Sequence, residues 1–360
     1  MKTLLLTVLG AALAAGPCAA QSNMLLALSK SDHTLAIVDP VTLKVIAKAP
    51  VGSDPHEVIA SADGKTAYVT IYGGGSLHEL DVIDLVNRKA LPPIDTKPFM
   101  GPHGITFVGG KVWFTAEGSK SVVRYDPASG AFDWAMGTGQ NRTHMIYVTP
   151  DQKRVYTTNV SSGTVSILVD TLIQPSGPPP GAPQGPGGPP PGAQGPGGPG
   201  GPPQGFHPQP HSDWVQTVIP VSKGSEGFDV SPDGKQLWTA AADDGTIAVI
   251  DLASKTVIDK IDAKVMGANR LQFTNDGKRV LISSLRNGDI VVYDAVSHKE
   301  VKKINVGHGA AGILMEPNGS RAFIGCTGDN YVAVIDLKTL TVVGRIDVGG
   351  GPDGLAWAIQ

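Results

Sequence analysis

Residues 231–263 read SPDGKQLWTAAADDGTIAVIDLASKTVIDKIDA. Asp233-Gly234 marks a tight turn, because glycine tolerates the positive φ that such turns require. Short runs rich in β-branched and apolar residues follow at 236–240, 246–250 and 256–261, with turn residues between them. Runs of this length and composition predict a three-strand meander.

The meander recurs along the chain, and its landmark is an apolar strand that ends in aspartate. The six aspartates are Asp39, Asp84, Asp126, Asp251, Asp294 and Asp336. A seventh copy, TVSILVD, has Val169 at this position and Asp170 one residue later. Neighbouring copies lie 42 to 45 residues apart, except for a gap of 82 residues between Val169 and Asp251 that holds an insert. A period near 42 residues with four short strands is typical of a β-propeller blade, so the chain is predicted to be an all-β, seven-bladed β-propeller.

The two ends of the chain predict how the ring closes. Residues 24–48 supply three strands without a turn before the first, and residues 354–359, GLAWAI, supply a single strand with no meander after it. Three strands and one strand make a complete blade. We therefore expect the C-terminal strand to pair with the N-terminal strands, which closes the ring and removes open sheet edges.

The propeller is expected to span residues 21–360, and two segments are expected not to form part of its blades. Residues 1–20 carry Lys2, an apolar stretch and small residues before Gln21, which is typical of a signal peptide and predicts a periplasmic or secreted protein. Pro17 before Cys18 fits a lipid-attachment site poorly. Residues 174–213 are rich in proline and glycine without a strict collagen register, so we expect a disordered insert within blade four.

Composition excludes several classes of function. The formal net charge of −3 argues against nucleic acid or an anionic membrane surface as partner, and beyond the signal peptide no long apolar run predicts a transmembrane segment. The usual catalytic motifs for zinc proteases, hydrolases and nucleotide binding are absent. Without Cys18, Cys326 is the one remaining cysteine, so no internal disulfide is expected. We expect a monomer held together by packing.

A second recurring segment precedes the strand that opens each blade. Aligned on its turn, one position holds His56, His103, His144, Glu226, Asn269, Ala311 and Asp353. The strands nearest the axis of a propeller converge on a central channel, so equivalent positions should form a ring there. Six of these seven residues are polar, and three consecutive ones are histidines.

The ring has two interpretations. Three neutral imidazoles with a carboxylate suit zinc, copper or iron, with Glu226 or Asp353 as carboxylate or base and Arg270 as a group that holds an anionic part of a ligand. Alternatively, these residues satisfy backbone groups and line a water-filled channel, and Pro-His-Gly is partly a turn device. Equal spacing shows that these residues occupy equivalent positions in the repeats. It does not show that their side chains converge within metal-bonding distance.

The repeats TPDQKRVYTTNVSSGTVSIL and SPDGKQLWTAAADDGTIAVIDLASKTV resemble those of YVTN-family β-propeller proteins. The resemblance covers nearly all of the chain outside the insert. It implies an exported seven-bladed propeller of the kind found among cell-surface and periplasmic binding proteins. Streptogramin lyases, which are metal-dependent, have similar Pro-His-Gly turns, but no other local motif matches.

The favoured hypothesis is a non-catalytic binding or scaffold propeller that recognises a protein or a small-molecule ligand at the face carrying the ring. Its candidate ligand-binding residues are His56, His103, His144, Glu226, Asn269, Arg270 and Asp353. The alternative is a metal-dependent lyase or hydrolase, whose divalent metal ion would be held by His56, His103 and His144.

Overall fold

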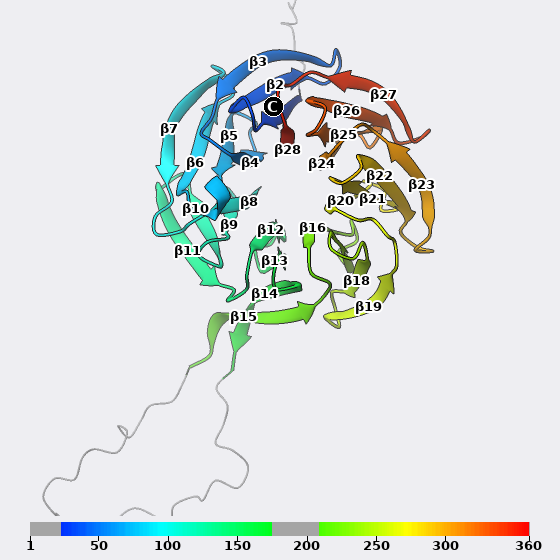
Figure 1. Ribbon diagram of the computed structural model, residues 1–360. Coiled ribbons are helices and arrows are strands. Elements are labelled where there is room, and N and C mark those ends of the chain that lie inside the picture. Colours follow the sequence, from blue (N-terminus) through cyan, green and yellow to red (C-terminus); the bar gives the residue numbers. More distant parts are fainter. Residues whose placement is uncertain (1–22, 175–208, 360) are drawn as a thin grey trace, which may run out of the picture.

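Each sequence repeat forms one antiparallel sheet of four strands, and seven such sheets surround a central channel (Figure 1). The computed structural model describes residues 23–174 and 209–359. The expected signal peptide lies outside these residues, as does most of the insert. Within the part of the chain that is described, no helix has the length and apolar character that a membrane crossing requires.

The blades are numbered one to seven from the N-terminus, and each contributes one strand to the wall of the channel. In blade order, these innermost strands are β28 (Pro352–Ala358), β4 (Pro55–Ala60), β8 (Pro102–Val108), β12 (Thr143–Val148), β16 (Ser225–Val230), β20 (Ala268–Phe273) and β24 (Ala310–Met315). The second strands are β1 (Met24–Ser29), β5 (Thr66–Ile71), β9 (Lys111–Ala116), β13 (Arg154–Asn159), β17 (Gln236–Ala241), β21 (Arg279–Ser284) and β25 (Arg321–Cys326).

Two further strands complete each blade toward the outside. The third strands are β2 (Thr34–Asp39), β6 (Glu79–Asp84), β10 (Ser121–Asp126), β14 (Thr164–Ile173), β18 (Ile247–Asp251), β22 (Asp289–Asp294) and β26 (Tyr331–Asp336). The outer strands are β3 (Lys44–Pro50), β7 (Lys89–Asp95), β11 (Ala131–Gly137), β15 (His211–Pro220), β19 (Thr256–Ile261), β23 (Glu300–Asn305) and β27 (Thr341–Ile346). One 3₁₀ turn, η1 (Gly73–Gly75), interrupts the loop after β5.

The predicted ring closure is confirmed. β28 lies antiparallel to β1, with Leu25 opposite Trp357 and Ala27 opposite Leu355. The last strand of the chain is therefore the innermost strand of blade one (Figure 1). The first and last parts of the described chain are held in one sheet.

The strand-ending aspartates are turn residues. Asp39 accepts hydrogen bonds from the backbone N–H of Val41 at 2.8 Å and from the hydroxyl of Thr42 at 2.7 Å. Equivalent bonds are made in blade five, where Asp251 accepts from the N–H of Ser254 at 2.7 Å. These carboxylates satisfy backbone donors where the chain reverses.

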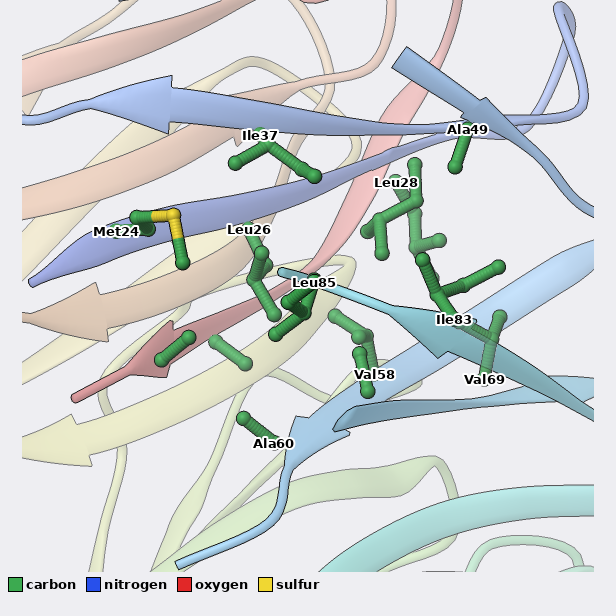
Figure 2. Close-up of a cluster of buried hydrophobic side chains, with 14 of the residues drawn as sticks. Met24, Leu26, Leu28, Ile37, Ala49, Val58, Ala60, Val69, Ile83 and Leu85 are labelled. Atoms are coloured by element: carbon green, nitrogen blue, oxygen red, sulfur yellow. The ribbon is translucent and has the colours of Figure 1, made fainter. Parts of the chain in front are cut away.

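The hydrophobic cores lie between blades rather than within them. Seven buried clusters occur in the described chain, one at each junction of neighbouring blades. Figure 2 shows the junction of blades one and two, where Leu26 and Leu28 of β1 meet Val58 of β4 and Ile83 of β6. Burying each such side chain stabilises the fold by about 1.5–3 kcal/mol. A blade therefore depends on both of its neighbours.

The observed hairpin of β14 and β15 overlaps the C-terminal end of the predicted insert, residues 174–213. The hairpin of β14 and β15 continues outward beyond the blade, with Asp170 opposite Trp214 and Ile173 opposite His211. Residues 211–213 are therefore strand, because the backbone ladder continues past the point where the sequence turns polar. Trp214 adds a ring contact with Trp134 of β11, at 4.8 Å between centroids.

Candidate functional site

The ring position is the second residue of every innermost strand. In six blades the register between the innermost and second strands shifts around this residue, for example between Pro102 and Ile105 in blade three. A similar irregularity lies between Ala27 and Ser29 opposite β28. Such bulges re-aim side chains and occur often beside binding sites. The seven side chains are thus placed by a common backbone device at one end of the channel, called here the channel mouth.

Threonine and serine residues of the second strands fix the backbone of the ring. The hydroxyl of Thr70 donates to the carbonyl of His103 at 2.8 Å, and the hydroxyl of Thr115 donates to the carbonyl of His144 at 2.5 Å. Each bond joins one blade to the next. Buried carbonyls need such partners, so the ring is rigid at its backbone.

The glycine after two of the ring positions has a packing role. A Cβ at Gly104 would lie 2.5 Å from the carbonyl oxygen of His144, and a Cβ at Gly312 would lie 2.1 Å from that of Asp353. Innermost strands of neighbouring blades approach each other closely here, which only glycine permits. The glycine of Pro-His-Gly is therefore structural, whereas its histidine faces the mouth.

The three ring histidines come together. The ring centroids of His56 and His103 are 4.6 Å apart, and those of His103 and His144 are 3.8 Å apart. Tyr72, which follows β5, contacts His56 and His103 edge-on at 4.7 and 5.0 Å. These histidines form a contiguous row over blades two, three and four.

Glu117 is the carboxylate that reaches the histidine row. It follows β9, and one oxygen makes a very short hydrogen bond with Nδ1 of His144, while the other accepts from the hydroxyl of Tyr72 at 2.5 Å. Arg142 Nε lies 3.6 Å from the same carboxylate. Burial alone would raise the pKa of Glu117, but the bond from His144 and the other donors hold it below its usual value. Glu117 is therefore ionised at neutral pH.

His103 lies at the centre of the row and is 2 % exposed. Burial, and then the neighbouring His144 and His56, hold its pKa well below 6.5, so the ring is neutral. Its Nδ1 has no hydrogen-bond partner among the described residues. A buried nitrogen without a partner is costly and points to a group that the protein itself does not supply.

His56 is engaged differently from the other two histidines. Its Nε2 lies 2.9 Å from the ammonium of Lys30 and 2.9 Å from Asp54. Burial and the positive charge of Lys30 lower the pKa of His56 to about 4. The same ammonium lies 3.3 Å from Asp353. His56 thus belongs to a network of hydrogen bonds and ion pairs on the side of blade one.

Arg270 does not fit the predicted role of holding an anionic ligand group. Its guanidinium makes a very short ion pair with Glu57 across the channel, from blade six to blade two, and lies 3.9 Å from Asp353. The arginine is 9 % exposed. Because its charge is already matched by internal carboxylates, it offers little to an incoming anion.

Neither Glu226 nor Asp353 supplies the carboxylate of the histidine row. Glu226 accepts a hydrogen bond from the side-chain amide of Asn269 at 2.6 Å and lies 3.6 Å from Arg142. Asp353 is turned to Lys30 and Arg270, whose charges outweigh burial and lower its pKa. Ala311 completes the ring as a buried apolar residue.

The channel mouth has an excess of negative charge. Its five carboxyl groups are Asp54, Glu57, Glu117, Glu226 and Asp353. They face three cationic side chains, those of Lys30, Arg142 and Arg270. Carboxyl groups therefore outnumber cationic side chains by two in this set of ion pairs. The mouth therefore favours a cation over an anion.

Three of the residues missed by the sequence prediction share a second repeat position. Lys30, Tyr72 and Glu117 each follow the second strand of their blade directly and lie 42 and 45 residues apart. Lys30 contacts His56 in the next blade, Tyr72 contacts Glu117, and Glu117 contacts His144. Aligning the repeats on this position would have placed these three residues beside the histidine ring.

A cavity of about 180 Å³ lies in the channel next to the mouth. Apolar side chains such as Phe228 and Leu271 line it together with the charged groups of Glu57, Arg270 and Asp229. Both carboxylate oxygens of Asp229 accept backbone N–H groups, from Val230 and Phe273, at 2.8 Å. Burial nevertheless raises the pKa of Asp229 to about 7.

This shift predicts a dependence of stability on pH. Between pH 4 and 7 the folded protein keeps the Asp229 proton and the unfolded chain loses it, so the free energy of unfolding should fall as pH rises through this window. Above pH 7 the free energy of unfolding should no longer change with the titration of Asp229. Urea unfolding at pH 4, 5.5, 7 and 8 measures the slope, which Asp229→Asn should reduce. The exposed turn variant Asp233→Asn should not reduce it, and equal slopes in all three proteins would contradict the prediction.

Fold and mouth together define a seven-bladed β-propeller with a polar site at one end of its channel. The family model of the cytochrome D1 heme domain matches residues 207–321, about a third of the chain. The three ring histidines lie outside the matched residues. No curated protein matches the chain.

Solved structures share the fold at low sequence identity. A functionally unknown protein from Desulfotomaculum acetoxidans has 13 % identity and a TM-score of 0.69, over 94 % of this chain and 99 % of that one. Hydrazine synthase from Kuenenia stuttgartiensis has 16 % identity and a TM-score of 0.62, over 84 % and 89 %. A dihydro-heme d1 dehydrogenase has 15 % identity and a TM-score of 0.59, over 91 % and 64 %. At these identities the similarity establishes the fold alone.

The channel does not fit a haem. Its cavity of about 180 Å³ is below the roughly 300–1,000 Å³ of pockets that enclose drug-sized ligands. The Glu57–Arg270 pair also crosses the channel at the mouth.

Proposed function

We propose that this protein is an exported, non-catalytic binding propeller that holds a small cationic ligand at the channel mouth. The observation that carries the proposal is the excess of two carboxyl groups over cationic side chains around the histidine row, in which His103 and His144 are buried. Low-dielectric surroundings strengthen the attraction of such a site for a cation. A ligand in contact with the row must be small, because neighbouring rings lie within 5 Å of each other.

The test compares small ions of opposite charge on the mature protein without an affinity tag. We expect Zn²⁺, putrescine or tetramethylammonium to raise the melting temperature, with acetate and phosphate giving no shift. A Glu226→Gln, Asp353→Asn double variant removes the charge excess and should weaken binding of the effective cation by about tenfold or more, as expected when about 1.4 kcal/mol is lost. Stabilisation by the anions alone, unchanged in the double variant, would contradict the proposal.

A metal-dependent lyase or hydrolase is the second candidate function. It is favoured by the pairing of two imidazoles with one carboxylate, a donor set that in catalytic zinc sites leaves a position for water. When bound, the metal would activate that water. The residues that hold such an ion differ from the predicted set, since Glu117 takes the place of His56. Turnover of an ester or lactone by the metal-loaded protein, lost in His103→Ala, would favour this function over simple binding.

A further inference from the structure

We propose that His103, Glu117 and His144 form a binding site for one divalent transition-metal ion. The inference rests on the proposed function, because it names the class of cation that the mouth takes. Each residue offers one donor atom, and the three donor atoms lie within 4.8 Å of one another. Ligands on a tetrahedral ion with bonds of 2.0–2.1 Å are about 3.4 Å apart. Small side-chain rotations therefore suffice to close the site.

The unpartnered nitrogen of His103 is an independent sign of a ligand. Its Nδ1 is fully enclosed and has no hydrogen-bond partner within residues 23–174 and 209–359, while most buried polar atoms in proteins have one. The neutral ring has a lone pair available for a metal. An ion in the histidine row would satisfy the atom that the fold leaves without a partner.

The surroundings of Glu117 orient it for coordination. The hydroxyl of Tyr72 holds one carboxylate oxygen, which leaves the other directed at His144. Thr115 fixes the carbonyl of His144 from the neighbouring blade. Metal ligands commonly depend on such outer partners, which set their orientation. The positive charge of Arg142 near Glu117 is shared with Glu226, so it is partly offset.

The donor set selects the kind of ion. Two imidazoles and one carboxylate suit Zn²⁺, Cu²⁺ or Fe²⁺, whereas Mg²⁺ and Ca²⁺ prefer oxygen ligands throughout. His56 is excluded from the set because the ammonium of Lys30 lies 2.9 Å from its Nε2 and would repel a metal there. The proposed ligands therefore come from blades three and four, and they differ from the set of three histidines predicted from the repeats.

The experiment uses the untagged mature protein, freed of metal by a chelator and then titrated with Zn²⁺ by calorimetry. Co²⁺ serves as a second probe, since its visible absorption reports the number and kind of ligands. We expect one equivalent of either metal. Loss of an outer partner of a metal ligand lowers metal affinity by about 10- to 100-fold, so we expect Tyr72→Phe to weaken binding by a factor in this range. Glu117→Gln and His103→Ala each remove a ligand and should weaken binding by more.

His298→Ala removes an imidazole that lies between β22 and β23 and pairs with Asp259, so it is the matched control and should bind within about threefold of the original protein, a difference below 1 kcal/mol. His56→Ala distinguishes the two ligand sets, because it should keep the one equivalent of metal that the three-histidine set would lose.

The metal titrations of the variants distinguish this ligand set from the three-histidine set and from binding of an organic cation. Circular dichroism and melting curves first establish that the variants are folded, and Glu117→Gln is conservative enough to keep the test valid if His103→Ala is not. Metal binding that survives Glu117→Gln, or that His56→Ala abolishes, overturns this ligand set. If no metal binds but an organic cation does, and binding needs Glu226 and Asp353, the metal inference fails and the proposed function stands. If no cation binds, both fail.

Discussion

Removal of residues 353–360 is expected to abolish cooperative folding of the entire ring. β28 is the innermost strand of blade one, pairs with β1, and lies between β4 and β24. Its Ala356 and Ala358 belong to the core between blades one and two, and Leu355 to the core between blades seven and one. Deletion opens two inter-blade cores and exposes the edge of β1.

The size of this effect follows from the marginal stability of proteins. Domains are stable by about 5–15 kcal/mol, and each buried large apolar side chain contributes about 1.5–3 kcal/mol. The indole of Trp357 also donates to the carbonyl of Met315 in blade seven at 2.8 Å, and that bond is lost. Circular dichroism, thermal unfolding and size-exclusion chromatography should report an unfolded or aggregated protein.

A shorter truncation provides the control. Removing residues 359–360 leaves the strand intact, and Ile359 is among the exposed hydrophobic residues. This variant should unfold close to the temperature of the full chain. If the chain lacking 353–360 melts cooperatively within a few degrees of the full chain, closure by β28 contributes little and the prediction is wrong.

Glu57→Ala is expected to destabilise the protein by about 3–5 kcal/mol, because it leaves a buried arginine without its main partner. Glu57 and Arg270 are 11 % and 10 % exposed at their side chains. Burial raises the pKa of Glu57, and the attraction of Arg270 is the largest effect that opposes it. The nearest remaining carboxylate, Asp353, lies 3.9 Å from the guanidinium and already contacts Lys30.

The double variant Glu57→Met, Arg270→Met separates the contribution of the ion pair to stability from the contribution of the volume that the two side chains fill. Replacing both partners by apolar groups of similar size is often neutral or stabilising, so most of the lost stability should return. Urea unfolding of the single and double variants measures the coupling. As a surface control, Lys278→Ala removes an exposed pair with Asp276 and should change little. Equal losses in the single and double Glu57 variants would contradict the predicted coupling.

The repeat allowed most of the fold to be predicted. The strands predicted at 236–240, 246–250 and 256–261 are observed within one residue of those bounds. Blade number, closure and the equivalence of the ring residues are confirmed, since a local pattern of turns and alternating burial repeats seven times. Residues 211–213, which the prediction assigns to the insert, are part of β15, because pairing between β14 and β15 continues through residues that lack a strand pattern.

The candidate site was predicted less completely. Repeat spacing identified His103 and His144, but Glu117 and Tyr72 occupy a different repeat position and were not considered. Arg270 was assigned to a ligand although Glu57 neutralises it across the channel. The ion pair of Arg270 and Glu57 joins residues that are 213 positions apart in the chain, and no local sequence pattern could show it.

By itself, the sequence determined the number of blades, the strand at which the ring closes and the equivalence of the three histidines in successive repeats. These features follow from short-range physics, namely turn chemistry and the alternation of apolar residues within each repeat. Only the tertiary structure decided which polar side chains meet. The curvature of seven packed blades brings Glu117 to His144, Lys30 to His56 and Arg270 to Glu57. Contacts across a channel depend on the shape of the whole ring, and that shape is set by packing between blades.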